Sequence, residues 1–145
     1  MGDRSGYQTD TERLKGYRQA LAEAGIEFAT ELAVLGDGRP EGALAAVDGL
    51  LKLADPPTAV CCYNDMTALG AMRSIRARGL RVPDDVSVTG FDDLFFAEYL
   101  EPALTTVRQD SQGNISLIPQ QVLISNSAAA NYNVYADIFA NLNGL

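Results

Sequence analysis

The sequence predicts an α/β domain in which a parallel β-sheet is flanked by helices. Residues 58–93 read as strand, helix and strand: a β-branched run at 58–63, a helix-period segment that ends at Gly79, and a second apolar run at 86–89. Two parallel strands joined by a crossover helix form a βαβ unit. Helical and apolar segments also alternate ahead of this unit, and a polar residue follows each of its strands.

The first half of the chain predicts two helices and one strand. A helix is expected to open at residues 9–12, where Thr and Asp are good caps, and to end at Gly25. Its buried stripe has helical spacing and consists of Leu14, Tyr17, Leu21 and Ala24. Residues 26–35 predict a strand whose apolar body is the run ELAVL. After a loop at 36–40 with Gly and Pro, residues 41–53 predict a second amphipathic helix.

The pattern is less regular beyond the βαβ unit. Residues 94–100 predict a short helical or irregular piece, and residues 103–109 an edge strand or a crossover. Residues 115–125 alternate like another strand, and residues 134–142 predict a weak terminal helix. At the other end, residues 1–5 lack the apolar run of a buried strand, although a strand usually feeds the first helix of such a sheet. The sequence therefore predicts a fragment whose sheet is cut at one strand.

The composition limits the function. The 145 residues suffice for one domain, and the net charge of −8 argues against binding to a phosphate backbone. No histidine is present, which excludes histidine-based triads and most zinc sites. Cys61 and Cys62 point to opposite faces of a predicted strand, so they do not bridge each other. No apolar stretch is long enough to span a membrane and no signal peptide is recognisable, so a soluble cytoplasmic protein is expected.

Three polar residues are predicted to meet at one edge of the sheet. Asn64 and Asp92 follow the strands of the βαβ unit, and the carboxyl ends of parallel strands form the edge at which open α/β sheets bind ligands. Arg13 lies in the first turns of a helix that begins at this edge, where the 36–40 loop also leaves its strand. A carboxylate, an amide and a guanidinium suit a small polyhydroxylated ligand. No histidine or second acid stands opposite for catalysis, so a binding site with no cofactor and no metal is expected.

Each of these residues also has a purely structural interpretation. Asn64 is a good N-cap for the helix that follows it. Asp92 and Asp93 can cap the 94–100 piece in the same way. Arg13 can be a solvated residue that pairs with a neighbouring acid on its own helix. The sequence alone leaves both interpretations open.

Two further alternatives concern the segment after the second strand of the unit. Paired carboxylates at Asp92 and Asp93 can hold Mg²⁺ for phosphoryl transfer, although the two lysines of the chain lie on predicted helices. A Mg²⁺-dependent phosphotransfer domain is therefore the weaker functional alternative. The aromatic side chains of the next segment are more often core or interface residues than ligand contacts; they are Phe95, Phe96 and Tyr99.

Three blocks in the correct order and spacing resemble the LacI/GalR family of bacterial transcription repressors. They are residues 12–26 (ERLKGYRQALAEAGI), 64–93 (NDMTALGAMRSIRARGLRVPDDVSVTGFDD) and 102–110 (PALTTVRQD). The resemblance implies a periplasmic-binding-protein type I fold. Residues 1–110 are similar to its C-terminal effector-binding subdomain, which has a flavodoxin-like, Rossmann-like parallel sheet. Residues 111–145 form an atypical tail, since a long helix that the family places there is skipped.

The resemblance implies one part of a sugar-responsive repressor that is not an enzyme. It places effector contacts on three residues named above: Arg13, Asn64 and Asp92. Gly38 stands where the family often has an aromatic residue that stacks on a sugar. A homodimer through the 66–78 helix and residues 99–100 is also implied, with DNA contacts made by other parts of the parent protein and none by this chain. A transport-type solute-binding protein of the same fold is the runner-up.

Overall fold

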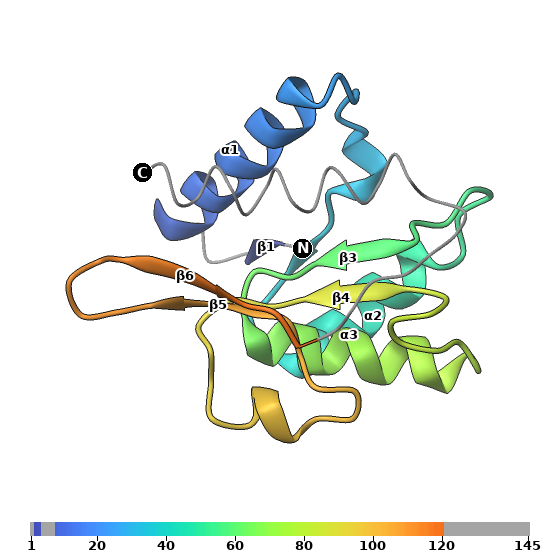
Figure 1. The fold of residues 1–145 in the computed structure, drawn as a ribbon. Coiled ribbons are helices and arrows are strands. Elements are labelled where there is room, and N and C mark those ends of the chain that lie inside the picture. Colours follow the sequence, from blue (N-terminus) through green and yellow to red (C-terminus); the bar gives the residue numbers. More distant parts are fainter. Residues whose placement is uncertain (1, 4–7, 121–145) are drawn as a thin grey trace.

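The computed structural model, which describes residues 2–3 and 8–120, is an α/β domain (Figure 1). The α-helices of the described part are α1 (Gln8–Glu23), α2 (Pro40–Leu50) and α3 (Asp65–Ala77). Its strands are β1 (Gly2–Asp3), β2 (Leu35–Gly36), β3 (Ala59–Cys61), β4 (Ser87–Thr89), β5 (Thr106–Gln109) and β6 (Ile115–Ile118). Short 3-10 helices occupy Thr30–Leu32 and Ala97–Tyr99.

The strands pair in three ladders. β1 pairs with β2 and β3 with β4, both in parallel, whereas β5 and β6 form an antiparallel hairpin. A parallel bridge between Thr89 and Thr105 connects β4 to the residue before β5. Figure 1 shows α2 and α3 on one side of β3 and β4 and α1 on the other side. The predicted α/β class, with parallel strands between helices, is confirmed.

The βαβ unit forms as predicted from the hydrophobic pattern. β3 and β4 run parallel with Val60 opposite Val88, and α3 crosses between them. The helix stops just before Gly79, whose φ of +75° is a left-handed conformation that glycine adopts at no steric cost. Cys61 is the last residue of β3 and Cys62 follows it, and both are free cysteines.

The hydrophobic core lies between the β3–β4 pair and the helices α2 and α3. Gly70 lets these two helices approach closely, because a Cβ at this position would lie 2.7 Å from the Cβ of Ala43 and would collide with the carbonyl oxygen of Pro40. The largest members of the cluster are apolar side chains with almost no exposed surface: Val47, Val60, Met72, Ile75, Val88 and Leu104.

The prediction of a strand over residues 26–35 is largely wrong. Thr30–Leu32 form a 3-10 helix, and β2 consists of Leu35–Gly36 alone. A strand persists only where a neighbouring strand supplies backbone partners, and β1 supplies two residues. The apolar pattern is also not a sign of burial here, because Leu35 is 58% exposed.

Residues 1–5 contribute a short strand, although their sequence predicts no buried one. Gly2–Asp3 form β1 and pair with β2 in parallel. Backbone N–H and C=O groups make this ladder, so a two-residue pairing leaves no trace in the pattern of apolar side chains.

The segments after β4 follow the predictions in part. A strand begins at Ile115, as expected, and pairs with β5 as far as Ile118. The predicted strand is too long at residues 119–120, which are described and lie outside β6. Its last part, 121–125, and the predicted helix over 134–142 lie outside the described residues. The division of the chain at residue 110 stays a prediction.

Candidate functional site

Asn64 joins the end of β3 to the start of α3 and to the 36–40 loop. Its side-chain oxygen accepts hydrogen bonds from the backbone N–H of Thr67 at 2.8 Å and from the Thr67 hydroxyl. Its amide nitrogen donates to the carbonyl oxygen of Gly38 at 3.2 Å. The capping interpretation of Asn64 is therefore confirmed, and the same amide also holds a loop at the predicted edge.

Arg13 reaches across from α1 to the ends of β3 and β4. Its guanidinium carbon lies 4.6 Å from the ring centroid of Tyr63 and 3.8 Å from that of Phe91. The guanidinium donates to the carbonyl oxygen of Tyr63 and lies 3.5 Å from a carboxylate oxygen of Asp92. Only 26% of this side chain is exposed, so the interpretation of Arg13 as a solvated helix residue is wrong.

Asp92 lies three residues after the end of β4 in an uncommon backbone conformation. Its φ is +113° and that of Asp93 is +52°, whereas residues other than glycine rarely adopt positive φ. The Asp92 N–H donates to the carbonyl oxygen of Val107 at 2.9 Å. Burial raises the pKa of the Asp92 carboxyl, and the positive charge of Arg13 partly opposes this shift.

The predicted capping role of Asp92 and Asp93 is not seen. The 3-10 helix Ala97–Tyr99 begins after Phe96, and no side chain caps it. Asp93 instead pairs its carboxylate with the guanidinium of Arg108 on β5. Phe95 and Tyr99 are 83% and 77% exposed, which contradicts a core role for these two aromatic side chains.

Asp65 is a central residue that the sequence analysis did not single out. It is the first residue of α3 and has no exposed surface. Its carboxylate accepts hydrogen bonds from the Thr106 hydroxyl at 2.5 Å and from the Leu94 N–H at 2.7 Å. Burial raises its pKa, and the charges of Asp92 and Asp93 add to the rise, while the hydrogen bonds oppose it. An acid in the first turn of a helix is usually solvated, so the sequence offered no signal of this burial.

The three predicted residues thus meet at one edge of the β3–β4 pair. Arg13 contacts Asp92 directly and contacts the carbonyl group of the residue before Asn64. The edge presents the guanidinium of Arg13 and the carboxylate of Asp92 beside two aromatic rings, a pair that can donate to and accept from hydroxyl groups. The amide oxygen of Asn64 already accepts two hydrogen bonds within the protein. Among the described residues, no group of three or more His, Cys, Asp or Glu side chains is placed to hold a metal ion. Within the same part of the chain, no helix has the length and apolar character needed to cross a membrane.

The chain is an α/β domain with polar side chains gathered at one edge of the β3–β4 pair. A family model described as a periplasmic binding protein-like domain matches residues 1–122, and the chain belongs to this family. The resemblance to LacI-family regulators is confirmed by relatives and solved structures.

Among the relatives, the probable transcriptional repressor ExuR of Bacillus subtilis is 44% identical over 120 residues, which are 83% of this chain and 36% of that protein. The transcriptional repressor PurR of Vibrio atlanticus is 42% identical over 98 residues, 68% of this chain and 29% of that protein. The chain therefore spans about a third of the length of the curated relatives it matches.

Solved structures agree with this assignment. A sugar-binding LacI-family regulator of Escherichia coli in complex with phosphate superposes with a TM-score of 0.77 at 31% identity, over 86% of this chain and 53% of that one. A complex of the transcriptional regulator CelR with cellobiose gives a TM-score of 0.71 at 40% identity, over 75% of this chain and 33% of that one.

Proposed function

We propose that this chain is part of the effector-binding domain of a sugar-responsive, LacI-type transcriptional repressor, and that it supplies one side of the effector cleft. The observation that carries the proposal is the convergence of Arg13, Asn64 and Asp92 at the carboxyl edge of β3 and β4. This is the edge at which open α/β sheets receive their ligands.

The chemistry of the edge suits a sugar. A carboxylate such as Asp92 accepts hydrogen bonds from two vicinal hydroxyl groups, and the guanidinium of Arg13 donates in a fixed fork. The two rings that flank Arg13, Tyr63 and Phe91, hold this fork in place. The cellobiose complex of CelR, a structural neighbour of this chain, supports a sugar as the effector.

The proposed activity is binding and not catalysis. Effector binding between two subdomains would shift a two-state closure and so change the DNA affinity of the parent protein. The net charge of −8 fits a chain that makes no DNA contact of its own. A cytoplasmic location and the absence of a cofactor follow from this proposal.

The proposal can be tested by titrating the ¹⁵N-labelled chain with a panel of mono- and disaccharides that includes cellobiose. At least one sugar is expected to shift the amide signals of residues 36–38, 63–65 and 91–94, with roughly millimolar affinity because one side of a cleft makes few hydrogen bonds. Arg13→Met is expected to abolish these shifts. Arg18→Met is the matched control, because Arg18 lies on the same helix but stacks on Phe28 at 4.3 Å.

Four outcomes would contradict parts of the proposal. Shifts that cluster elsewhere, or no shift with any sugar, would contradict the proposed site. Micromolar binding by this chain alone would contradict the claim that it supplies only one side of the cleft. Stabilisation by Mg²⁺ in a melting scan, lost in Asp93→Asn, would favour the phosphotransfer alternative.

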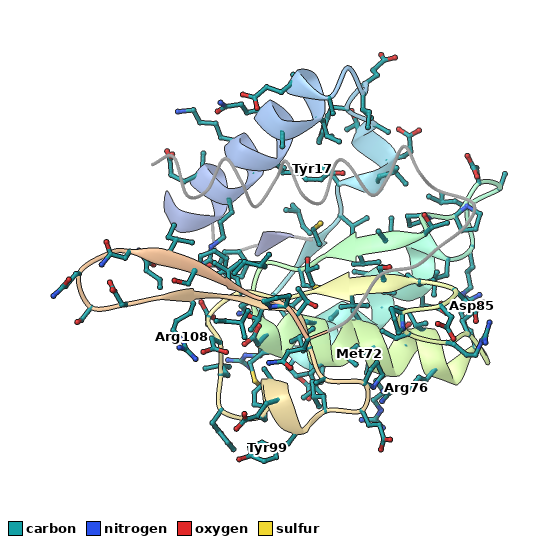
Figure 2. The ribbon with its side chains drawn as sticks, in the orientation of Figure 1. Tyr17, Met72, Arg76, Asp85, Tyr99 and Arg108 are labelled. Carbon is teal, nitrogen blue, oxygen red and sulfur yellow. The ribbon has the colours of Figure 1, made fainter. Side chains whose placement is uncertain are left out.

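The proposal includes a homodimer that pairs through α3 and the segment after β4. Phe95 and Tyr99 are the most exposed large hydrophobic side chains of the described residues, and Figure 2 shows Tyr99 pointing away from the rest of the domain. Light scattering is expected to find a dimer that the double variant Phe95→Ser, Tyr99→Ser converts to a monomer. Leu35→Ser, at another exposed apolar side chain, is the control and is expected to leave the dimer intact. A wild-type monomer would contradict this part.

The runner-up is a transport-type solute-binding protein of the same fold. The curated relatives, which are named transcriptional repressors, favour the regulator. The gene sequence upstream decides between the two, because a repressor requires a helix-turn-helix segment there.

A further inference from the structure

We propose that Asp65 is a positioning residue for the ligand edge, the carboxyl edge of β3 and β4 where Arg13, Asn64 and Asp92 lie. Its buried hydrogen bonds fix the turn that aims Phe91 and Asp92 at Arg13. This inference rests on the proposed function only for the role of Asp92 as a ligand contact. The claim about the geometry of the turn concerns this chain alone.

Asp65 holds the turn at both of its ends. Its backbone N–H donates to the carbonyl oxygen of Phe91 at 2.8 Å, at the start of the turn. Its carboxylate accepts from the N–H of Leu94 at 2.7 Å, at the end of the turn. Asp92, one of the two residues between these anchors, carries the carboxylate that faces Arg13.

The turn needs this support because its backbone is strained. Asp92 and Asp93 both have positive φ, a conformation that is unfavourable for residues other than glycine and persists only where the surroundings enforce it. The hydroxyl of Thr106 adds a second tie: it donates to Asp65 at 2.5 Å and accepts from the N–H of Asp93 at 3.3 Å. One buried carboxylate therefore connects α3, β5 and the turn.

The packing around the carboxylate shows that the site is shaped for it. Gly90 leaves the space, because a Cβ at this position would collide with a carboxylate oxygen of Asp65 and would lie 3.0 Å from a methyl carbon of Leu104. A buried carboxylate is costly unless it is hydrogen-bonded, and a cap on α3 alone does not require it, since Asn64 already caps that helix. What the Asp65 carboxylate adds is the hold on the turn.

The consequence falls on two contacts of Arg13. Phe91 stacks on the guanidinium at 3.8 Å and Asp92 approaches it at 3.5 Å, and both residues belong to the turn that Asp65 anchors. If the turn relaxed to negative φ, the Asp92 side chain would point in another direction. The ligand edge would then lose its carboxylate without any change in Asp92 itself.

The test is NMR on the full chain with no sugar present. Backbone chemical shifts of Asp92 and Asp93 report the positive φ, and hydrogen exchange of the Leu94 amide reports the anchor. In Asp65→Asn we expect the positive-φ shift pattern to be lost and the Leu94 amide to exchange at least about tenfold faster, the factor that corresponds to 1.4 kcal/mol.

A matched control separates positioning from stability. Ser74 is buried on the same helix, and its hydroxyl donates to the carbonyl oxygen of Leu44 at 3.2 Å, so Ser74→Ala also removes a buried hydrogen bond of α3. This variant should be destabilised but should keep the shift pattern of Asp92. A folded Asp65→Asn chain with the wild-type pattern would overturn the proposal.

Thr106 supplies a second route should Asp65→Asn fail to fold. Thr106→Ser keeps the hydroxyl and should keep the pattern, whereas Thr106→Val removes it and should weaken the pattern; identical spectra for the two would overturn the proposal. Because these measurements contain no sugar, they stand apart from the sugar titration. A wild-type chain that binds no sugar would contradict the proposed function and leave this result unchanged.

Discussion

α1 and α3 are helices of similar length that serve the domain in opposite ways. Eight of the 13 residues of α3 are buried, and they contact α2, β4 and the turn after β4. In α1, among residues 11–23, the buried side chains are Ala20 and Leu21. α1 is held instead by Arg13 between two rings and by the edge-to-face contact of Tyr17 with Phe28, whose ring centroids are 6.2 Å apart.

This difference assigns structural support to the βαβ unit of β3, α3 and β4, called the frame, and the proposed ligand contact Arg13 to α1. Hydrophobic burial fixes the position of α3. Because Asn64 caps this helix and Asp65 begins it, the position of α3 also determines where Asn64 and the turn after β4 lie. α1 contributes the guanidinium but little apolar burial. A lightly packed element such as α1, which carries the proposed ligand contact Arg13, is able to move more easily than the frame.

The largest expected effect is on the frame. Ile75 has no exposed surface, so Ile75→Ala is expected to lower the free energy of unfolding by about 3 kcal/mol through lost burial and a cavity. Leu21→Ala on α1 is expected to cost about half as much, because a lightly packed helix can shift to fill the space. Urea denaturation measures both values, and equal losses would contradict the contrast between the helices.

The next effect concerns the contact between α2 and α3. Gly70→Ala is expected to destabilise the domain by about 1–3 kcal/mol, because the new methyl group collides with the carbonyl of Pro40. Gly49 is the matched control: it lies in α2 with open space around it, so Gly49→Ala should stabilise by up to about 1 kcal/mol. A neutral Gly70→Ala would mean that the helices are less tightly packed than described.

The docking of α1 is expected to give a smaller change. Arg13→Met removes two cation–π contacts and a partly exposed ion pair, for a loss of about 1 kcal/mol. Arg18→Met removes one such contact and should cost less. Thermal melting of the two variants checks the order, and a larger loss for Arg18→Met would contradict it.

The smallest effect depends on pH. The pKa of Asp65 is raised in the folded state, so between its ordinary and its raised value the folded chain binds more protons than the unfolded chain. The wild-type free energy of unfolding therefore contains a contribution that falls as pH rises through this window, and Asp65→Asn lacks it. The free energy of unfolding of Asp65→Asn, relative to that of the wild type, should therefore increase from about pH 4 towards neutral pH. Urea midpoints at several pH values measure this, and a pH-independent difference would contradict the raised pKa.

The sequence predicts the βαβ unit well because its signals are local. Period-3.6 and β-branched runs define the elements, and strand ends place Asn64 and Asp92 at one edge. The ring contacts of Arg13 and the side-chain hydrogen bonds of Asp65 depend on residues 29 to 78 positions away, which no local pattern contains. β1 is not predicted for a related reason: its two residues pair with β2 through backbone groups, which leave no pattern of apolar side chains.

Native-state hydrogen exchange by NMR tests the central claim most directly, namely that a stable βαβ frame carries the proposed ligand edge and that the arginine of this edge comes from a lightly held helix. The amides of α3 are expected to exchange only through global unfolding, and those of α1 at least about tenfold faster through local opening. Arg13→Met should speed exchange in α1 and leave α3 unchanged after correction for stability. Equal protection of α1 and α3, or equal acceleration in both, would contradict the account.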